Sequence, residues 1–304
     1  MIELGLSAGA ARPTVLIHDD SYAGWVFDST HPTQGRRFLL GAELIAKQGD
    51  VRVVAPDEAS REQLLTVHTP DYVNRVLVDH VCDEWAGARP NLSRLAARFV
   101  AGTVTALQEL MSGRAEVAVH LPGGKHHAKA DRSSGFCVFA DLAIAAHSAV
   151  SQGHRVAILD IDAHHGDGTE ELCRAIPQVL TFSVHQFGIF PGTGERDNPT
   201  DHIYNEPLAA GSGDAQLGSA IERFVMVAKQ FQPTLLFIAS GADGHRDDPL
   251  SNLNYTRDGF SAAGQQVQRA FPHLPTLVTG AGGYRPDDAT PQSWAAFVAG
   301  VSGR

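Results

Sequence analysis

Cysteine is scarce in this 304-residue chain, and long apolar runs are absent from it. The three cysteines, Cys82, Cys137 and Cys173, form no CxxC pair; this excludes a disulfide scaffold and a cysteine-built structural zinc site, and suits a reducing compartment. No run reaches the roughly 18 apolar residues that cross a bilayer. The start, MIELGLSAGAARP, has an early Glu3 and no long apolar stretch, unlike a signal peptide. The sequence therefore predicts a cytoplasmic protein without a membrane span.

The chain also has fewer basic than acidic residues. The chain has 24 Lys and Arg against 34 Asp and Glu, a net charge of −10 and a pI near 5.8. This balance argues against direct binding to nucleic-acid backbone and is compatible with a cationic substrate. No internal repeat, low-complexity tract or Pro/Ser-rich linker marks a boundary. With 43% hydrophobic residues, we expect one domain with a large core, spanning residues 1–304.

Short β-rich runs alternate with helical patterns along the chain. We expect strands at 14–18, 51–55, 116–121, 155–161, 179–185, 234–240 and 276–281. We expect helices at 35–47, 67–79, 92–111, 141–152, 168–175, 214–231, 256–270 and 291–300. This alternation predicts the α/β class, with an open, mostly parallel sheet covered by helices on both faces.

The stretch LDIDAHHGDGT (159–169) follows the apolar strand at 155–159. Asp160, Asp162 and His164 alternate along it, so they face one side while the chain stays extended. Two carboxylates and an imidazole at a strand end repel and desolvate one another unless a cation or a proton network joins them. The alternative interpretation is a solvated turn after a buried strand.

Three other expected strands end in reactive side chains. His126 and His127 follow the strand at 116–121, Asp243 follows that at 234–240, and Tyr284 follows that at 276–281. Ligands of open parallel sheets bind at the carboxyl ends of the strands. Because a parallel sheet places all four ends along one edge, the sequence predicts a functional site there.

Asp162, His164 and Asp243 make a plausible metal-binding set. Three nitrogen and oxygen ligands with one open position are typical of a catalytic zinc site, whereas a structural site uses four ligands. Two carboxylates donate charge to the metal, so the bound water is acidified less than by three histidines. Such a site needs a base nearby, and His126 and His127 could supply it.

Other polar residues of these loops suit supporting roles. Asp160 and Asp167 can accept hydrogen bonds from imidazole N–H groups, which fixes the tautomer and raises the basicity. His165 is out of phase with His164, which favours a structural role or a supporting position behind the metal ligands over direct metal binding. Tyr284 follows two glycines and could donate a hydrogen bond to a developing oxyanion, although a tyrosine that simply packs at the strand end is the alternative.

These motifs resemble one family. The matching segments, in matching order, are HPTQGRR (31–37), VHTPDYV (67–73), PGGKHHA (122–128), SGFCVFAD (134–141), LDIDAHHGDGT (159–169), TFSVH (181–185), FPGTGE (190–195), SGADGHRDDPL (240–250) and GAGGY (280–284). The chain is similar to the arginase-fold zinc deacetylases, which include histone deacetylases, acetoin-utilisation proteins and acetylpolyamine amidohydrolases. The resemblance implies an eight-stranded parallel sheet and an amidohydrolase that removes acetyl or other acyl groups from amines such as acetyl-lysine or acetylpolyamine.

The resemblance also implies ions and catalytic roles. Zinc, with Fe²⁺ as the alternative, would be bound by Asp162, His164 and Asp243. Structural potassium is implied near Asp160, Asp162, His164, Ser183 and Val184. His127, paired with Asp167, would be the general base and then the acid. His126, paired with Asp160, would be its electrostatic partner, and Tyr284 would polarise the carbonyl.

A substrate tunnel is implied as well. Its wall would be formed by Gly135, Phe136 and Phe190, with Leu250 at the rim, although the phenylalanines are core residues by default. Arg36 or Arg37 would lie beside an internal acetate cavity, and Asp83 or Glu84 would be an acidic rim residue. Lys125 departs from the family, in which a bulky apolar residue often precedes the histidine pair.

Two other functions remain open from the sequence. A binuclear manganese ureohydrolase bridges its metals with an Asp-x-His-x-Asp run, but here Gly166 stands two residues after His164 and the carboxylate comes at Asp167. A non-catalytic protein that binds acylated amines on the same scaffold is the second alternative. Under each interpretation the partner is a small molecule or peptide rather than nucleic acid or membrane, and the sequence leaves the oligomeric state open.

Overall fold

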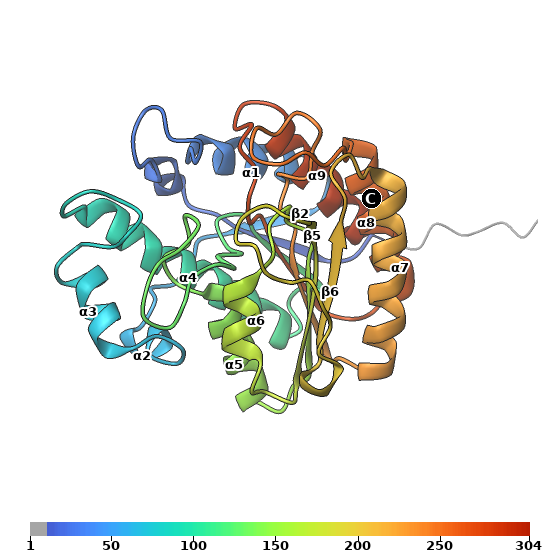
Figure 1. The fold of residues 1–304 in the computed structure, drawn as a ribbon, viewed down its shortest axis with the longest axis horizontal. Coiled ribbons are helices and arrows are strands. Elements are labelled where there is room, and N and C mark those ends of the chain that lie inside the picture. Colours follow the sequence, from blue (N-terminus) through green and yellow to red (C-terminus); the bar gives the residue numbers. More distant parts are fainter. Residues whose placement is uncertain (1–10) are drawn as a thin grey trace, which may run out of the picture.

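One sheet of eight strands lies at the centre of the computed structural model, which describes residues 11–304 (Figure 1). The strands are β1 (Thr14–Ile17), β2 (Val51–Val54), β3 (Val117–His120), β4 (Val156–Asp160), β5 (Val179–Gln186), β6 (Ile203–Leu208), β7 (Leu235–Ala239) and β8 (Thr276–Thr279). They are all parallel, in the order β2-β1-β3-β8-β7-β4-β5-β6.

Helices cover both faces of this sheet. They are α1 (Arg36–Ala46), α2 (Arg61–Leu64), α3 (Pro70–Leu77), α4 (Pro90–Met111), α5 (Asp141–Ser151), α6 (Asp167–Cys173), α7 (Asp214–Phe231), α8 (Arg257–Ala270) and α9 (Ala289–Ser302). Figure 1 shows α4, α5 and α6 on one side and α1, α7, α8 and α9 on the other. The predicted α/β class, the parallel sheet and its helical cover are therefore confirmed.

The central strands are buried on both faces. Every residue of β3, β4, β7 and β8 is buried, which explains why their sequences read as continuous apolar runs rather than as alternating patterns. The edge strand β2 is only partly covered, and Val53 is half exposed. In the part of the chain that the structure describes, no helix has the length and apolarity needed to cross a membrane.

Local sequence signals account for several helix starts. Thr69 caps α3 by accepting a hydrogen bond from the Tyr72 N–H, and Pro70 occupies the first helical position. Thr256 caps α8 in the same way through the Gly259 N–H. The one-turn helix α2 and the edge strand β6 were not predicted from the sequence. The β6 sequence IYNEPL combines a charged residue with proline, which is unusual in a strand. The absence of a signal peptide was predicted mainly from residues 1–10, which lie outside the described residues.

The strand order brings the four predicted reactive ends together. β3, β8, β7 and β4 are consecutive in the sheet, although they are far apart in the sequence. Their registers align His120 with Thr279, Thr279 with Ala239, and Ala239 with Asp160. The loops that leave these strands therefore start side by side at one edge, which is the position of the candidate site.

Candidate active site

Three buried side chains at this edge could hold a metal ion. Asp162, His164 and Asp243 offer ligand atoms that lie within 4.8 Å of one another. The His164 Nδ1 atom lies 3.1 Å from Asp162 Oδ1 and 3.0 Å from Asp243 Oδ2. Ligand atoms about 2.0–2.2 Å from one zinc ion are separated by roughly this distance. The donor set and its spacing therefore fit a single divalent cation.

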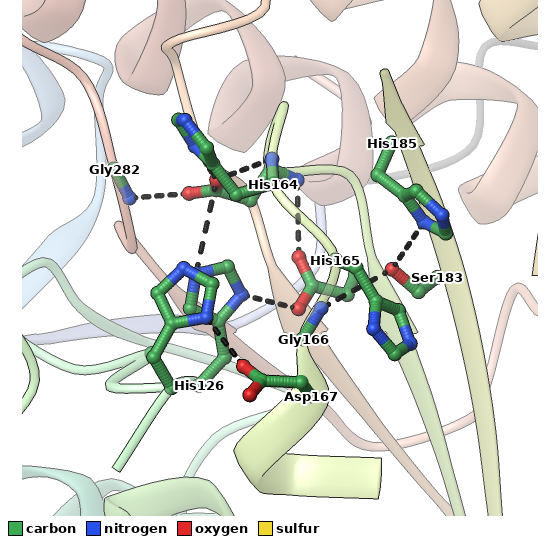
Figure 2. A network of polar contacts seen from close by, with 12 residues as sticks. His126, His164, His165, Gly166, Asp167, Ser183, His185 and Gly282 are labelled. Carbon is green, nitrogen blue, oxygen red and sulfur yellow. Dashed lines mark hydrogen bonds and ion pairs between the residues drawn. The ribbon is translucent and has the colours of Figure 1, made fainter. Parts of the chain in front are cut away.

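Backbone contacts fix the two carboxylates of this cluster. The Ala163 N–H donates to Asp243 Oδ1 at 2.8 Å, and the Gly282 N–H, from the loop after β8, donates to Asp162 Oδ2 at 2.6 Å (Figure 2). A Cβ atom on Gly282 would lie 2.2 Å from Asp243 Oδ2 and 2.5 Å from Asp162 Oδ2. Glycine is therefore required at position 282 for the loop to approach the cluster this closely.

The charges of the cluster also favour a cation. Burial opposes protonation of His164, but hydrogen bonds and charges from Asp162 and Asp243 outweigh it and raise the pKa of His164 to about 11. Burial and the neighbouring Asp162 charge raise the pKa of Asp243 to about 6. The two carboxylates thus hold the His164 imidazole in its protonated form, and a divalent cation would satisfy the same carboxylates by displacing that proton.

Two histidine–aspartate pairs lie beside the cluster. The Nδ1 atom of His126 lies 2.7 Å from Asp160 Oδ2, and the Nδ1 atom of His127 lies 2.6 Å from Asp167 Oδ1. The two imidazole rings are 4.0 Å apart between centroids. Figure 2 shows His126 and Asp167 below His164, and the His127 ring lies 6.1 Å from the His164 ring between centroids. Lys129 Nζ binds the other oxygen of Asp167 at 2.6 Å, which holds that carboxylate in place.

The two histidines have opposite protonation behaviour. Burial disfavours the charged form of His126, but the carboxylates of Asp160 and Asp162 outweigh it and raise its pKa to about 9. Burial and the charge on His126 lower the pKa of His127 to about 3, although Asp167 opposes this shift. Contacts to His127 and Lys129 hold the pKa of Asp167 below its usual range despite its burial, so Asp167 accepts the His127 Nδ1–H. The Nε2 atom of His127 is then free to take a proton.

Tyr284 stays protonated under ordinary conditions. Burial raises the pKa of its phenol well above 10, and the charges of Asp243 and Asp162 add to the effect. The Tyr284 N–H donates to Asp248 Oδ2 at 2.7 Å, and the guanidinium of Arg37 lies 5.5 Å from the phenol ring while donating to the Gly283 carbonyl. The phenol is therefore held as a hydrogen-bond donor near the metal-binding side chains.

A pocket of about 420 Å³ leads to these groups. Its lining residues are Glu84, His127, Gly135, Phe136, His164, Ile189, Phe190, Leu250 and Tyr284. The exposed Phe190 ring packs edge-on against His127, 4.9 Å between centroids. A Cβ atom on Gly135, which has φ +54°, would lie 2.4 Å from His127 Cδ2. All four predicted tunnel residues thus line one pocket whose walls are mostly apolar.

The structure distinguishes between Arg36 and Arg37, which the sequence left as alternatives. Arg37 is completely buried next to Tyr284, with its guanidinium against the rings of Phe38 and Trp294. Arg36 is half exposed and forms an ion pair with Asp287 at 2.6 Å. Of the two candidates, only Arg37 belongs to the interior behind the pocket.

The residues predicted for potassium lie where β4 and β5 end. Asp160 and Ser183 are directly paired in the sheet, and Val184 is buried beside them. The Ser183 hydroxyl contacts His185 Nδ1 at 3.0 Å, and Figure 2 shows this contact linked to Gly166. A cavity of only about 10 Å³ adjoins Asp160 and Ser183. Of the five residues predicted for potassium, only Asp160 and Ser183 line this cavity.

His165 does not belong to the metal-binding cluster. Its Nδ1 atom contacts the Thr193 hydroxyl at 2.8 Å, and its Nε2 atom lies 3.0 Å from Glu170. Both ring nitrogens are therefore used to connect the start of α6 to the loop after β5. The predicted structural role agrees with these contacts.

Sequence reasoning overlooked Asp141, which supports the histidine pair. This buried carboxylate accepts hydrogen bonds from the Thr103 hydroxyl at 2.6 Å, the Gly124 N–H at 2.9 Å and the Lys125 N–H at 2.7 Å. It thereby fixes the loop that carries His126. The only signal in the sequence is that an aspartate ends the apolar run GFCVFA, and such an aspartate also suits an ordinary helix start.

Lys125 is buried without an ion pair among the described residues. Its Nζ atom lies 5.3 Å from the ring of Phe99 and 5.9 Å from those of Trp25 and Phe38. Burial lowers the pKa of Lys125 from 10.5 to about 8. One pKa unit corresponds to about 1.4 kcal/mol, so the charged amine destabilises the folded state by roughly 3 kcal/mol at pH 7.

We therefore expect Lys125→Met to raise the free energy of unfolding by about 1–3 kcal/mol at pH 7. Between pH 8 and pH 10.5 the folded state binds fewer protons than the unfolded state. The destabilisation by the charged Lys125 amine is therefore complete below pH 8 and decreases at higher pH. Urea unfolding at pH 7 and pH 10 measures both effects. Lys229→Met, at an exposed lysine, is the control. If Lys125→Met raised the free energy of unfolding equally at both pH values, the explanation would be contradicted.

Comparisons with known proteins agree with this geometry. A sequence model of the histone deacetylase domain matches residues 31–301. The acetoin utilization protein AcuC of Staphylococcus aureus is 31% identical over 309 residues, which cover 92% of this chain and 79% of the relative. Histone deacetylase 8 of Xenopus tropicalis is 31% identical over 316 residues, covering 95% of this chain and 84% of the relative. A crystal structure of the HDA15 HD domain is similar, with a TM-score of 0.83 at 25% identity, covering 93% of this chain and 89% of the other.

The family match extends over most of the chain rather than over one motif. The matched range begins before α1 and ends within α9, so it includes all four loops that form the pocket base. The structural similarity covers 93% of this chain. The chain therefore belongs to the histone deacetylase family, whose members are deacetylases.

Proposed function

We propose that the protein is a zinc-dependent amidohydrolase that removes acetyl or other acyl groups from acylated amines. One observation carries the proposal. A three-ligand metal-binding cluster, a neutral histidine oriented by a carboxylate, and a protonated tyrosine meet at the base of one largely apolar pocket. Metal-assisted hydrolysis of an amide needs these three kinds of group and a place for the amine's alkyl stem.

The metal-binding residues would be Asp162, His164 and Asp243. Zinc bound there supplies positive charge that polarises a carbonyl and lowers the pKa of water. Fe²⁺ would suit the same oxygen and nitrogen ligands. We also propose potassium as a structural ion at Asp160, Asp162, His164, Ser183 and Val184; the pairing of Asp160 with Ser183 at the ends of β4 and β5 supports it.

His127 would move the protons of the reaction. Its Nε2 atom takes a proton from the attacking water, and Asp167 stabilises the resulting imidazolium through Nδ1. The same proton is then given to the nitrogen of the departing amine. His126, held in its charged form by Asp160, adds a fixed positive charge near the carbonyl. Tyr284 donates a hydrogen bond to the oxyanion as the carbonyl carbon becomes tetrahedral.

The structure argues against two metals. Within residues 11–304, the one group of His, Cys, Asp and Glu side chains with metal-binding geometry is Asp162, His164 and Asp243. Asp167 could be a bridging ligand in a ureohydrolase, but its two oxygens contact His127 and Lys129 instead. A mononuclear site is therefore favoured, in a single catalytic domain that we place in the cytoplasm.

Metal removal and reloading test the proposal. We expect the chelator-treated protein to release no amine from acetyl-lysine peptides, acetylpolyamines or longer acyl analogues, and one equivalent of zinc to restore release. The amine is measured by fluorescence labelling and the metal by elemental analysis. Tight binding of these compounds without cleavage would indicate a binding protein, and activity that requires two manganese ions per chain would indicate a ureohydrolase.

A further inference from the structure

Lys125 places a positive charge in the interior, next to the histidine pair. Its backbone N–H donates to Asp141 at 2.7 Å, but no described residue accepts a hydrogen bond from its ammonium or forms an ion pair with it. Burial lowers the pKa of this amine only to about 8, so it is charged at pH 7. A buried cation without an acceptor is destabilising unless a ligand supplies one.

Two other buried donors near this ammonium also lack acceptors. Trp25 Nε1 and Arg37 Nε are buried, and neither donates a hydrogen bond to a described residue. The Lys125 Nζ atom lies 5.9 Å from the ring centroids of both Trp25 and Phe38. The Arg37 guanidinium lies 4.9 Å from the centroid of the same Phe38 ring. Because buried donors are normally satisfied, three unpartnered donors around these rings, two of them cationic, indicate an anionic ligand.

These donors lie beyond the base of the pocket. Neither cation lines the pocket, yet each is close to a residue that does. The Arg37 guanidinium lies 5.5 Å from the centroid of the Tyr284 ring, and Lys125 is separated from His127 only by His126. The alkyl stem of the amine would fill the apolar pocket that opens to solvent. The acyl chain, on the other side of the carbonyl, would therefore point toward the buried cations.

We propose that the protein accepts acyl groups that end in a carboxylate, and that the Lys125 ammonium binds this carboxylate. A succinyl group is one example. Its amide carbonyl would lie between His127 and Tyr284, and its two methylene groups would carry the carboxylate past the pocket base toward Lys125. Water would add across the amide C–N bond, so that the amine leaves with the proton and the acyl group leaves as a dicarboxylate. The inference rests on the proposed deacylase function.

Two substrates that differ by one charge test this inference. One is an N-succinyl alkylamine, and the other carries a terminal carboxamide in place of the carboxylate. We expect the wild-type kcat/KM to be higher for the succinyl compound, and Lys125→Met to lower the ratio of the two values by about 10-fold to 100-fold. Because Lys125→Met should stabilise the fold, a folding defect would not explain this loss. Lys229→Met, at an exposed lysine, is the control and should leave the ratio unchanged.

Two results would overturn the role of Lys125. The first is a ratio that stays the same in Lys125→Met, since the charge would then have no part in recognising the acyl group. The second is a wild-type protein that releases amine from the acetyl and carboxamide compounds but not from the succinyl compound. In that case the deacylase proposal would still stand.

Failure of the deacylase proposal gives a different result. The zinc-loaded wild-type protein then cleaves none of these compounds, the acetylated amine included. Calorimetry with the intact succinyl compound tests the inference in that case, and wild type should bind it about 10-fold more tightly than Lys125→Met. Equal affinities would show that Lys125 does not bind the carboxylate.

Discussion

His127→Asn is expected to lower kcat for deacylation by about 10²-fold to 10⁴-fold while the zinc content stays at one ion per chain. Asparagine can replace the hydrogen bond to Asp167, but it cannot take a proton from water at neutral pH. His127 does not belong to the cluster of Asp162, His164 and Asp243, so metal binding should survive. Steady-state kinetics and elemental analysis of the same preparation measure both quantities.

Controls separate this role from simple disruption of the fold. His147→Asn changes a partly buried histidine of α5 whose Nε2 atom lies 3.3 Å from the Leu172 carbonyl oxygen and which does not line the pocket, so kcat should be unchanged. His126→Asn should reduce kcat less than His127→Asn because His126 contributes charge rather than proton transfer. If His126→Asn were inactive and His127→Asn retained full activity, the two roles would have to be exchanged.

The residues of the site were predictable from sequence because they follow strongly apolar strands. The pattern before Asp160 and that before Asp243 each identify a buried parallel strand, and such strands place their following loops at one edge. The sequence could not predict that β4 pairs with β7 as well as with β5, because strand order depends on helix packing far away in the chain. The prediction that Asp243 joins Asp162 and His164 therefore rested on its position after an expected strand and on the family resemblance, not on a predicted strand order.

The supporting residues of the site were not predicted from the sequence, because the role of each depends on which side chains it contacts in the fold. Lys129 and Asp248 are ordinary charged residues in the sequence, yet one holds Asp167 and the other accepts the Tyr284 N–H. The adjacent histidines His126 and His127 have the same chemistry in the sequence. Their pKa values move in opposite directions because two carboxylates surround the first, whereas the second meets burial and its charged neighbour.

Electrostatics connects these supporting residues to the proposed reaction. Arg37 is buried behind the pocket, and its charge opposes the rise in the pKa of Tyr284 that burial and the carboxylates cause. The net result still leaves the phenol protonated, so Tyr284 is available as a donor rather than as a base.

Tyr284→Phe is expected to lower kcat by about 10²-fold to 10³-fold with zinc still bound, because one hydrogen bond to the oxyanion is lost. The effect on KM should be small, since the bond strengthens only as the carbonyl becomes tetrahedral. The phenylalanine ring can keep the packing against Phe136, so stability should change little. Kinetics, zinc analysis and thermal unfolding of the variant measure these three quantities.

The pH dependence provides an independent check of the same role. Because the phenol pKa lies well above 10, the wild-type kcat should not fall between pH 8 and pH 9.5 through ionisation of Tyr284.

Tyr72→Phe is a suitable control for Tyr284→Phe, since the Tyr72 hydroxyl donates to the Val138 carbonyl away from the pocket. Unchanged turnover in Tyr284→Phe would remove the tyrosine from the mechanism. Stabilisation of the oxyanion would then have to come from the metal and from the imidazolium of His126.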